Sequence, residues 1–312
     1  MTALRVVGGA EIEAGADLRE LIGDMESSLR DDVRRHSVTP ARFMEVRDSP
    51  YSVFGAMPSM SDPHDLFVTK VAALVDAGGG AAPGRTTVNA VVVVFSISTG
   101  EALAVLDGAA LTDVKCAAIT GLVTDLCATP HARTLGVVGT GALALQQVRG
   151  AAAVRDLDRV TVYGRDPDRA GRFADRARRS LGGAVEVAVT SSLREAVEGQ
   201  DVVCTATTSS EPLLTGFDLP PPVHVNCMGS HTPESREVSA ELLESSVLLV
   251  EDRATAVREA GHRHHRALEL EEALRRGPEL RAARTVFSSV GHGFLDLETT
   301  AHILKRLGGA RR

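Results

Sequence analysis

Lys70 is the residue whose type and position most directly indicate chemistry, because it interrupts the apolar stretch Leu66–Val75 (LFVTKVAALV). An unpaired ammonium group is costly in apolar surroundings. Burial also lowers the pKa of an amine towards values suited to proton transfer. Lys70 is therefore a candidate catalytic residue. The alternative is a surface lysine whose aliphatic stem lies along apolar neighbours while its charge stays in water.

A glycine turn within Arg133–Gln147 (RTLGVVGTGALALQQ) is the second chemical signal. The apolar run before it predicts a buried strand, and helical composition begins after it. Strand, G-x-G-x-x-A turn and helix in this order form the dinucleotide-binding fingerprint, in which the helix N-terminus receives the pyrophosphate. We therefore predict that five consecutive residues contact a dinucleotide: Gly139, Thr140, Gly141, Ala142 and Leu143.

The choice between the two nicotinamide dinucleotides depends on the residues just after the second strand, Val160–Tyr163. An NAD-binding unit usually ends this strand in Asp or Glu, which accepts a hydrogen bond from the ribose 2′-hydroxyl. Here Gly164 and Arg165 come next, and a guanidinium group matches the 2′-phosphate of NADP. The sequence therefore favours NADP(H) over NAD(H). The alternative is that Arg165 is a solvated loop residue and that Asp166 accepts from the ribose.

The order of apolar runs predicts the elements that hold these residues. From Leu135 to Val250, strand-like and helix-like segments alternate, which is typical of an α/β fold with a mostly parallel sheet. The first third is strand-rich and contains one amphipathic helix. Specific expectations are a helix over Asp17–Arg34, a strand from Tyr51 that ends at Met57-Pro58, a helix that begins in Glu234–Glu237, a polar helix over Glu259–Arg276 and a terminal helix over Leu297–Leu307.

Composition excludes several classes of function. The 312 residues carry a formal net charge of -7 without a long basic run, which argues against nucleic acid as a partner. No apolar run is long enough to cross a bilayer, so we expect no membrane association. The four cysteines lack metal-binding spacing and fit a reducing cytoplasm. His262, His264 and His265 lie among arginines and are interpreted as a solvated face, so no metal site is expected.

Short motifs form an ordered series along the whole chain. They are Pro40-Ala41-Arg42, Met57-Pro58, Lys70-Val71, Thr87–Ala90 (TVNA), Thr99–Ala104 (TGEALA), Leu111-Thr112, Gly139-Thr140-Gly141, Met228–Pro233 (MGSHTP), Arg236-Glu237, Phe287–Gly291 (FSSVG) and Asp296-Leu297. Each motif is weak by itself. In this order and spacing, the chain resembles the ornithine cyclodeaminase/μ-crystallin family over nearly its whole length.

The resemblance implies a Rossmann-type doubly wound parallel sheet inserted into an α+β domain that binds substrate and dimerises. The expected boundaries are 1–120, with 291–312 returning to it, for the substrate and dimerisation domain, and 121–290 for the dinucleotide-binding domain. Members of this family are usually homodimers. Their shared chemistry is hydride exchange at an α-carbon that bears nitrogen and a carboxylate, so the expected substrate is a small α-amino or α-imino acid.

The resemblance also implies roles for individual residues. Arg42 and Lys70 match positions that bind the substrate carboxylate, and Lys70 also acts on the reacting centre through water. Lys115 stands where the family commonly has arginine, so the charge is kept but the bidentate fork is lost. Thr87 matches a threonine that lines the site, with a plain strand threonine as the alternative. Cofactor contacts are expected at Thr205, Thr207, Met228, Gly229 and Val290.

Two departures from the family pattern narrow the activity. His231 replaces the aspartate of cyclodeaminases and is either a general acid or a spacer over the cofactor. Phe54-Gly55-Ala56 replaces their acidic residue before Met-Pro. Because both groups that would meet ornithine's second amine are missing, we favour an NAD(P)H-dependent oxidoreductase acting on the C–N bond of an α-amino or cyclic α-imino acid. Examples are a ketimine reductase and an amino-acid dehydrogenase.

Two alternatives stay open from the sequence. One is an ornithine cyclodeaminase-like lyase, which releases ammonia and uses its nicotinamide transiently. The other is a non-catalytic protein, similar to μ-crystallin, that binds NADP(H) and a small ligand. Cofactor oxidation and ammonia release distinguish the three functions.

Overall fold

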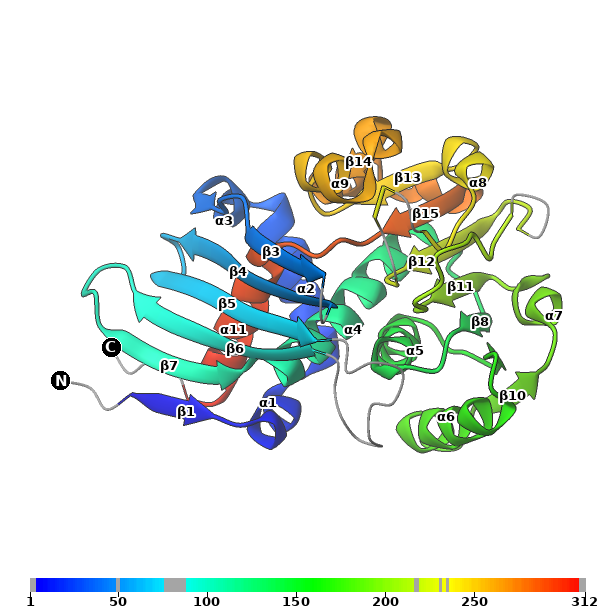
Figure 1. The fold of residues 1–312 in the computed structure, drawn as a ribbon, viewed down its shortest axis with the longest axis horizontal. Helices are drawn as coiled ribbons and strands as arrows, with labels where there is room; N and C mark the ends of the chain where they lie inside the picture. The colour runs from blue at the N-terminus through cyan, green and yellow to red at the C-terminus, as the bar shows by residue number, and fades with distance from the viewer. Residues whose placement is uncertain are drawn as a thin grey trace. The chain divides into compact units, whose positions relative to one another are not determined.

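The computed structural model describes residues 4–48, 51–75, 88–215, 219–229, 232–233 and 236–308. The chain forms two compact units, Met1–Lys115 with His292–Arg312, and Cys116–Gly291. Each unit has its own sheet (Figure 1), and the predicted α/β fold class is confirmed. None of the helices in the described ranges is long and apolar enough to cross a membrane.

The first unit is built on a seven-stranded sheet in the order β1-β7-β6-β5-β4-β2, with β3 also pairing with β4. Its strands are β1 (Arg5–Val7), β2 (Ser37–Val38), β3 (Phe43–Asp48), β4 (Tyr51–Ser61), β5 (Leu66–Val75), β6 (Val88–Ser96) and β7 (Ala102–Asp107). Its helices are α1 (Gly9–Gly15), α2 (Leu18–Arg30), α3 (Asp32–Arg35) and α11 (Gly293–Arg306). Helix α4 (Gly108–Cys127) begins in this unit and ends in the second.

One face of this sheet is covered by the terminal helix α11, which packs on β4 and β5 (Figure 1). Along β5 the buried residues Leu66, Val68 and Lys70 alternate with more exposed ones, as side chains on a strand point to opposite faces in turn. Lys70 therefore lies on the face that α11 covers. Residues from the end of the sequence provide its surroundings.

The amphipathic helix predicted over Asp17–Arg34 is present but is split. Its predicted apolar face is buried at Leu21 and Met25. Helix α2 ends at Arg30 because Asp31 takes an extended conformation and caps it through its backbone N–H. The short helix α3 comes next, so the prediction of one continuous helix is wrong.

The strand predicted to end at Met57-Pro58 instead continues to Ser61. Proline lacks the N–H that a sheet ladder uses, so it is tolerated only where no partner needs that donor. Strand β4 pairs with β3 up to Ala56 and with β2 from Met60. Pro58 lies in the gap between these partners, which explains why the strand passes through it.

The second unit contains an eight-stranded sheet in the order β10-β9-β8-β11-β12-β15-β13-β14, with parallel pairing throughout. Its strands are β8 (Thr134–Val138), β9 (Arg159–Tyr163), β10 (Glu186–Thr190), β11 (Val202–Thr205), β12 (Val223–Cys227), β13 (Val247–Val250), β14 (Leu268–Glu269) and β15 (Arg284–Ser288). Its helices are α5 (Ala142–Val154), α6 (Pro167–Ser180), α7 (Leu193–Val197), α8 (Ala240–Glu244), α9 (Arg253–Ala260) and α10 (Leu270–Arg276), with 3-10 turns η2 (His262–Arg266) and η3 (Gly277–Ala282). The strand order reverses between β8 and β11, and a switch point of this kind is where open α/β sheets bind dinucleotides.

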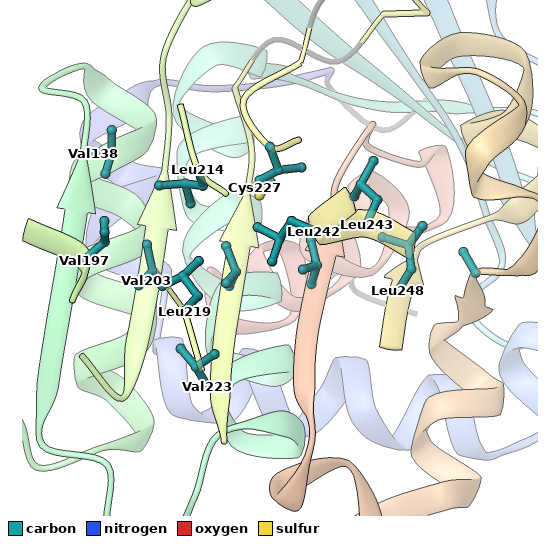
Figure 2. Close-up of a cluster of buried hydrophobic side chains, with 14 of the residues drawn as sticks. Val138, Val197, Val203, Leu214, Leu219, Val223, Cys227, Leu242, Leu243 and Leu248 are labelled. Carbon is teal, nitrogen blue, oxygen red and sulfur yellow. The ribbon is translucent and has the colours of Figure 1, made fainter. Parts of the chain in front are cut away.

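Apolar side chains fill both faces of this parallel sheet. Val203, Leu214 and Cys227 belong to one buried cluster, part of which Figure 2 shows. A second cluster, which includes Val137, Val148 and Phe173, packs strands against α5 and α6. Because both faces are covered, only the strand ends are left for ligand contact.

The prediction of one polar helix over Glu259–Arg276 is wrong. Helix α9 ends at Ala260, because Gly261 adopts a φ of 97°, a left-handed conformation that glycine accepts without strain. The 3-10 turn η2, strand β14 and helix α10 occupy the rest of the stretch. The sequence did not reveal this division, because the stretch is rich in charged residues and its apolar residues do not recur at a regular spacing.

Candidate functional site

The carboxylate of Asp296 joins two buried lysines of the first unit. Lys70 Nζ donates a hydrogen bond to Asp296 Oδ1 at 2.9 Å and lies 2.9 Å from Oδ2. Lys115 Nζ lies 3.1 Å from Oδ1. Lys70 is 4% exposed, Lys115 5% and Asp296 1%. The sequence has lysine at only one other position, Lys305, which is exposed near the end of α11. Two of the three lysines in the sequence therefore lie at one carboxylate.

Three distant elements bring this group together. Lys70 comes from β5, Lys115 from α4, and Asp296 from the first turn of α11. Burial raises the pKa of the Asp296 carboxyl, but the charges of Lys115 and Lys70 outweigh burial and hold that pKa below its usual range. Asp296 is therefore a carboxylate shared by two ammonium groups. Since breaking a buried ion pair is costly, the group is held firmly in place.

The charge of Lys70 is paired, because Asp296 accepts a hydrogen bond from its ammonium group. Sequence reasoning gave Asp296 no role. Its only signal was the motif Asp296-Leu297, and the terminal helix was predicted to begin at Leu297, whereas α11 begins at Gly293. An aspartate in the first turn of a buried helix is the signal that could have found it.

Arg42 is brought towards Lys70 by the register of the sheet. Phe43 pairs with Ala56 across β3 and β4, and Lys70 pairs with Met57 across β4 and β5. Arg42 immediately precedes Phe43 and is half-buried. Thr87 and His231, the other predicted site residues, lie outside the described residues.

The glycine turn of the second unit has the geometry that a dinucleotide needs. Gly139 has a φ of 116°, and a Cβ there would overlap the Ala206 carbonyl. Helix α5 begins at Ala142 with Gly141 as an N-cap that provides no side-chain hydrogen bond. A Cβ on Gly141 would meet nothing within 4 Å. The backbone N–H groups in the first turn of a helix have no partner within the helix, and such groups bind phosphate. The residues fit the pyrophosphate of a nicotinamide dinucleotide.

The residues after β9 differ in how their side chains are used. Asp166 is the N-cap of α6, and its Oδ1 accepts a hydrogen bond from the Arg169 N–H at 3.0 Å. Arg165 is exposed. The carboxylate considered as an alternative ribose acceptor is therefore engaged in capping a helix.

Glu237 connects the loops that extend from β11 and β12. Its Oε2 accepts from the Thr205 hydroxyl at 2.6 Å and from the Gly229 N–H at 2.8 Å, and its Oε1 accepts from the Thr207 N–H at 2.6 Å. Glu237 is 0% exposed. Burial raises the pKa of its carboxyl, although these hydrogen bonds oppose the shift. A Cβ on Gly229 would overlap the Glu237 carboxylate, so this approach requires glycine.

Sequence reasoning placed Glu237 at the start of a helix, which is wrong. Helix α8 begins at Ala240, with Ser239 as its N-cap, while Glu234 and Ser235 lie outside the described residues. The side chain of Thr205 is also fully buried and donates to Glu237. Among the predicted cofactor residues, Thr205 and Met228 are buried, whereas Thr207 and Gly229 are partly exposed.

Glu251, at the end of β13, holds the loop after β15 in the same way. It accepts hydrogen bonds from the Ser289 hydroxyl, from the Val290 N–H at 3.2 Å and from the Gly291 N–H at 3.1 Å. Glu251 is 5% exposed. Val290 is one of the predicted cofactor residues, so the loops after β11, β12 and β15 all rest on buried carboxylates.

The histidines after α9 divide between surface and interior. His262 and His265 stack with ring centroids 4.5 Å apart. His264 is 2% exposed and pairs with the Ser288 hydroxyl at 2.9 Å, so its interpretation as part of a solvated face is wrong. Within the described part of the chain, no group of three or more His, Cys, Asp or Glu side chains could hold a metal ion.

Comparison with known proteins identifies the family. Residues 5–307 match the sequence model of the ornithine cyclodeaminase/mu-crystallin family. The chain belongs to this family. The resemblance inferred from the ordered motifs is confirmed.

Two relatives of the chain are reductases by name. The chain is 32% identical to the ketimine reductase mu-crystallin of Rattus norvegicus over 208 residues, which cover 66% of this chain but only 64% of that protein. It is 26% identical to a Delta(1)-pyrroline-2-carboxylate reductase of Bacillus cereus over 316 residues, 96% of each chain. These names agree with the predicted class, an oxidoreductase that acts on C–N bonds.

A solved structure shows the same fold. The Delta(1)-pyrroline-2-carboxylate reductase of Thermococcus litoralis, in complex with NADH and L-proline, matches with a TM-score of 0.90 and 24% identity. The match covers 97% of both chains. The predicted α/β fold with a Rossmann-type parallel sheet is confirmed.

Proposed function

We propose that this protein is an NAD(P)H-dependent oxidoreductase that acts on the C–N bond of an α-amino or cyclic α-imino acid. The observation that carries the proposal is the pair of buried lysines at Asp296, because fixed ammonium groups suit a substrate carboxylate. The names of the relatives support the reaction class. When bound, the nicotinamide supplies or accepts the hydride.

The chain's own residues bind the substrate and move the proton. Arg42, Lys70 and Lys115 hold the carboxylate and so fix the α-carbon. Asp296 keeps the two lysines close together and charged. The proton that the substrate nitrogen gains on reduction comes from Lys70 through water or from His231. Fixed cations and a positioned proton donor lower the barrier to hydride transfer, since they require no rearrangement during the reaction.

A substrate panel tests this function. We expect net oxidation of NADPH when the protein meets cyclic α-imino acids, or α-keto acids together with an amine, and no oxidation with imines that lack the carboxylate. Absorbance of the reduced nicotinamide measures the result. Ammonia release from ornithine without net cofactor oxidation would instead identify a cyclodeaminase. Tight NADP(H) binding without turnover on any member of the panel would identify a binding protein.

We further propose that NADP(H) is preferred over NAD(H), because Arg165 is exposed beside β9 while Asp166 is occupied as a helix cap. Arg165→Ala should raise the KM for NADPH about ten- to a hundredfold and leave that for NADH unchanged, since a hydrogen bond to a charged group contributes about 1.5–3 kcal/mol. Asp166→Ser is the matched control, because serine also caps helices. A lower KM for NADH than for NADPH in the wild-type protein would contradict the preference for NADP(H).

A homodimer in the cytoplasm completes the proposal. Phe43, Ala56, Val71 and Val91 form one row across β3, β4, β5 and β6 on the sheet face opposite α11. Phe43 is 62% exposed, and Val71 and Val91 are each 46% exposed. Contiguous exposed apolar side chains of this kind mark interaction surfaces. A second copy of the chain, as in other family members, would cover them.

A further inference from the structure

Glu237 and Glu251 are buried carboxylates whose partners are all hydrogen-bond donors without charge. Each accepts from two backbone N–H groups and one hydroxyl. Within the described ranges, no lysine, arginine or histidine forms an ion pair with either of them. A backbone N–H group can only donate, so these contacts favour the ionised form. A buried charge without an opposite charge costs free energy, and such a feature calls for an explanation.

The position of the two carboxylates offers one. Glu237 holds the loops at the carboxyl ends of β11 and β12, and Glu251 comes directly after β13 and holds the loop after β15. These strands are neighbours in the sheet. They lie on the opposite side of the β8–β11 switch point from β9, where Arg165 marks the adenine half of the site. Dinucleotides bind across such a switch point, so the nicotinamide half belongs to the loops that these two carboxylates support.

The oxidised nicotinamide ring carries a positive charge, and the reduced ring is neutral. A buried anion beneath the ring therefore attracts one redox form more than the other. We propose that Glu237, with Glu251 beside it, positions the nicotinamide loops and makes the site bind the oxidised cofactor preferentially. This inference rests on the proposed function, because it requires a nicotinamide dinucleotide in the second unit.

Preferential binding of the oxidised form favours hydride donation. Reduction of the imine adds a hydride to the carbon and a proton to the nitrogen, and it would leave a bound nicotinamide with a positive charge. Glu237 and Glu251 would then supply the opposite charge. A site of this kind makes the bound reduced cofactor a stronger reductant than it is in water and directs the protein towards amine formation.

Glu237→Gln tests the proposal through binding rather than turnover. Dissociation constants for NADP⁺ and NADPH are measured by calorimetry on the complete protein. Looser loops would weaken both forms equally, whereas loss of the charge weakens only NADP⁺. We expect the ratio Kd(NADP⁺)/Kd(NADPH) to rise about tenfold, the order of magnitude expected for the loss of one unit charge in partly buried surroundings. For a two-electron couple, tenfold corresponds to a potential about 30 mV higher.

Asp201→Asn is the matched control. Asp201 accepts from the same set of donors, the backbone N–H groups of Arg133 and Thr134 at 2.8 and 2.9 Å and the Thr134 hydroxyl at 2.9 Å. It lies at the amino ends of β8 and β11, at the edge of the sheet opposite the loops. We expect the ratio Kd(NADP⁺)/Kd(NADPH) of Asp201→Asn to equal that of the wild-type protein.

The outcomes separate this inference from the proposed function. An unchanged ratio in Glu237→Gln, or an equal change in Asp201→Asn, would overturn the role of the buried charge while leaving the oxidoreductase function standing. Failure of the unchanged protein to bind either nucleotide would instead refute the cofactor assignment itself. Glu251→Gln gives a second measurement with the same expected sign, so a folding defect in one variant does not remove the test.

Discussion

Replacing Lys70 by methionine is expected to lower turnover of the imino acid about 10²–10⁴-fold, the usual contribution of a positioned proton-transfer group. Methionine is unbranched and only one atom shorter than lysine, and it removes the ammonium group with its charge and donors. Asp296 then retains Lys115 as a partner 3.1 Å away, so the carboxylate and ammonium that remain form a balanced pair. The variant should therefore fold, and steady-state kinetics should show the loss mainly in kcat.

The same variant should bind NADPH as tightly as the unchanged protein, because the dinucleotide turn belongs to the second unit. Lys305→Met is the matched control, since Lys305 is exposed near the end of α11 and changes nothing at Asp296. Retention of full turnover in Lys70→Met would show that the buried lysine is structural, and the proposed mechanism would then fail. Loss of turnover in Lys305→Met would indicate an unspecific effect of removing lysine.

The second unit could be predicted closely because local sequence and overall topology agree there. Apolar strands of the parallel sheet are bounded by helices with clear caps, such as Asp166 before α6 and Ser192 before α7. The glycine turn at Gly139 carries its own signature, since a non-glycine residue would overlap Ala206. Prediction failed after Glu259, where charged residues left no periodic signal and Gly261 broke the helix.

The site was harder to predict because its partners are distant in sequence. Lys70 could be singled out by its apolar neighbours, but Asp296 lies 226 positions away and on another element. Glu237 was interpreted as a charged helix start, because glutamate is seldom buried without a cation. Its partner Thr205 ends strand β11, and its partner Gly229 lies in the loop after β12. Hydrogen bonds between loops arise from tertiary packing, and one sequence contains no record of them.

Replacing Asp296 by asparagine is expected to lower the free energy of unfolding by about 3–5 kcal/mol, the cost of removing one member of a buried ion pair. The Asp296→Asn variant should be less stable than the Lys70→Met variant because of the charges that each substitution leaves behind. Loss of one lysine leaves a neutral pair, whereas loss of Asp296 leaves Lys70 and Lys115 as neighbouring cations at sites 4% and 5% exposed. Urea unfolding at neutral pH measures the difference, and imino acid turnover should fall as well because the lysines lose their fixed positions.

The double variant Asp296→Asn with Lys115→Met separates charge repulsion from lost packing. Removing one of the two cations should recover part of the lost stability, so the double variant should be more stable than Asp296→Asn alone. If it is less stable, packing rather than charge determines the effect.

The pH dependence of stability gives an independent check. The pKa of Asp296 is lowered in the fold from an ordinary value of 3.8, so its contribution is complete above that pH and is lost as the pH falls below it. The stability gap between the unchanged protein and Asp296→Asn should therefore stay constant from neutral pH down to that value and narrow only in stronger acid.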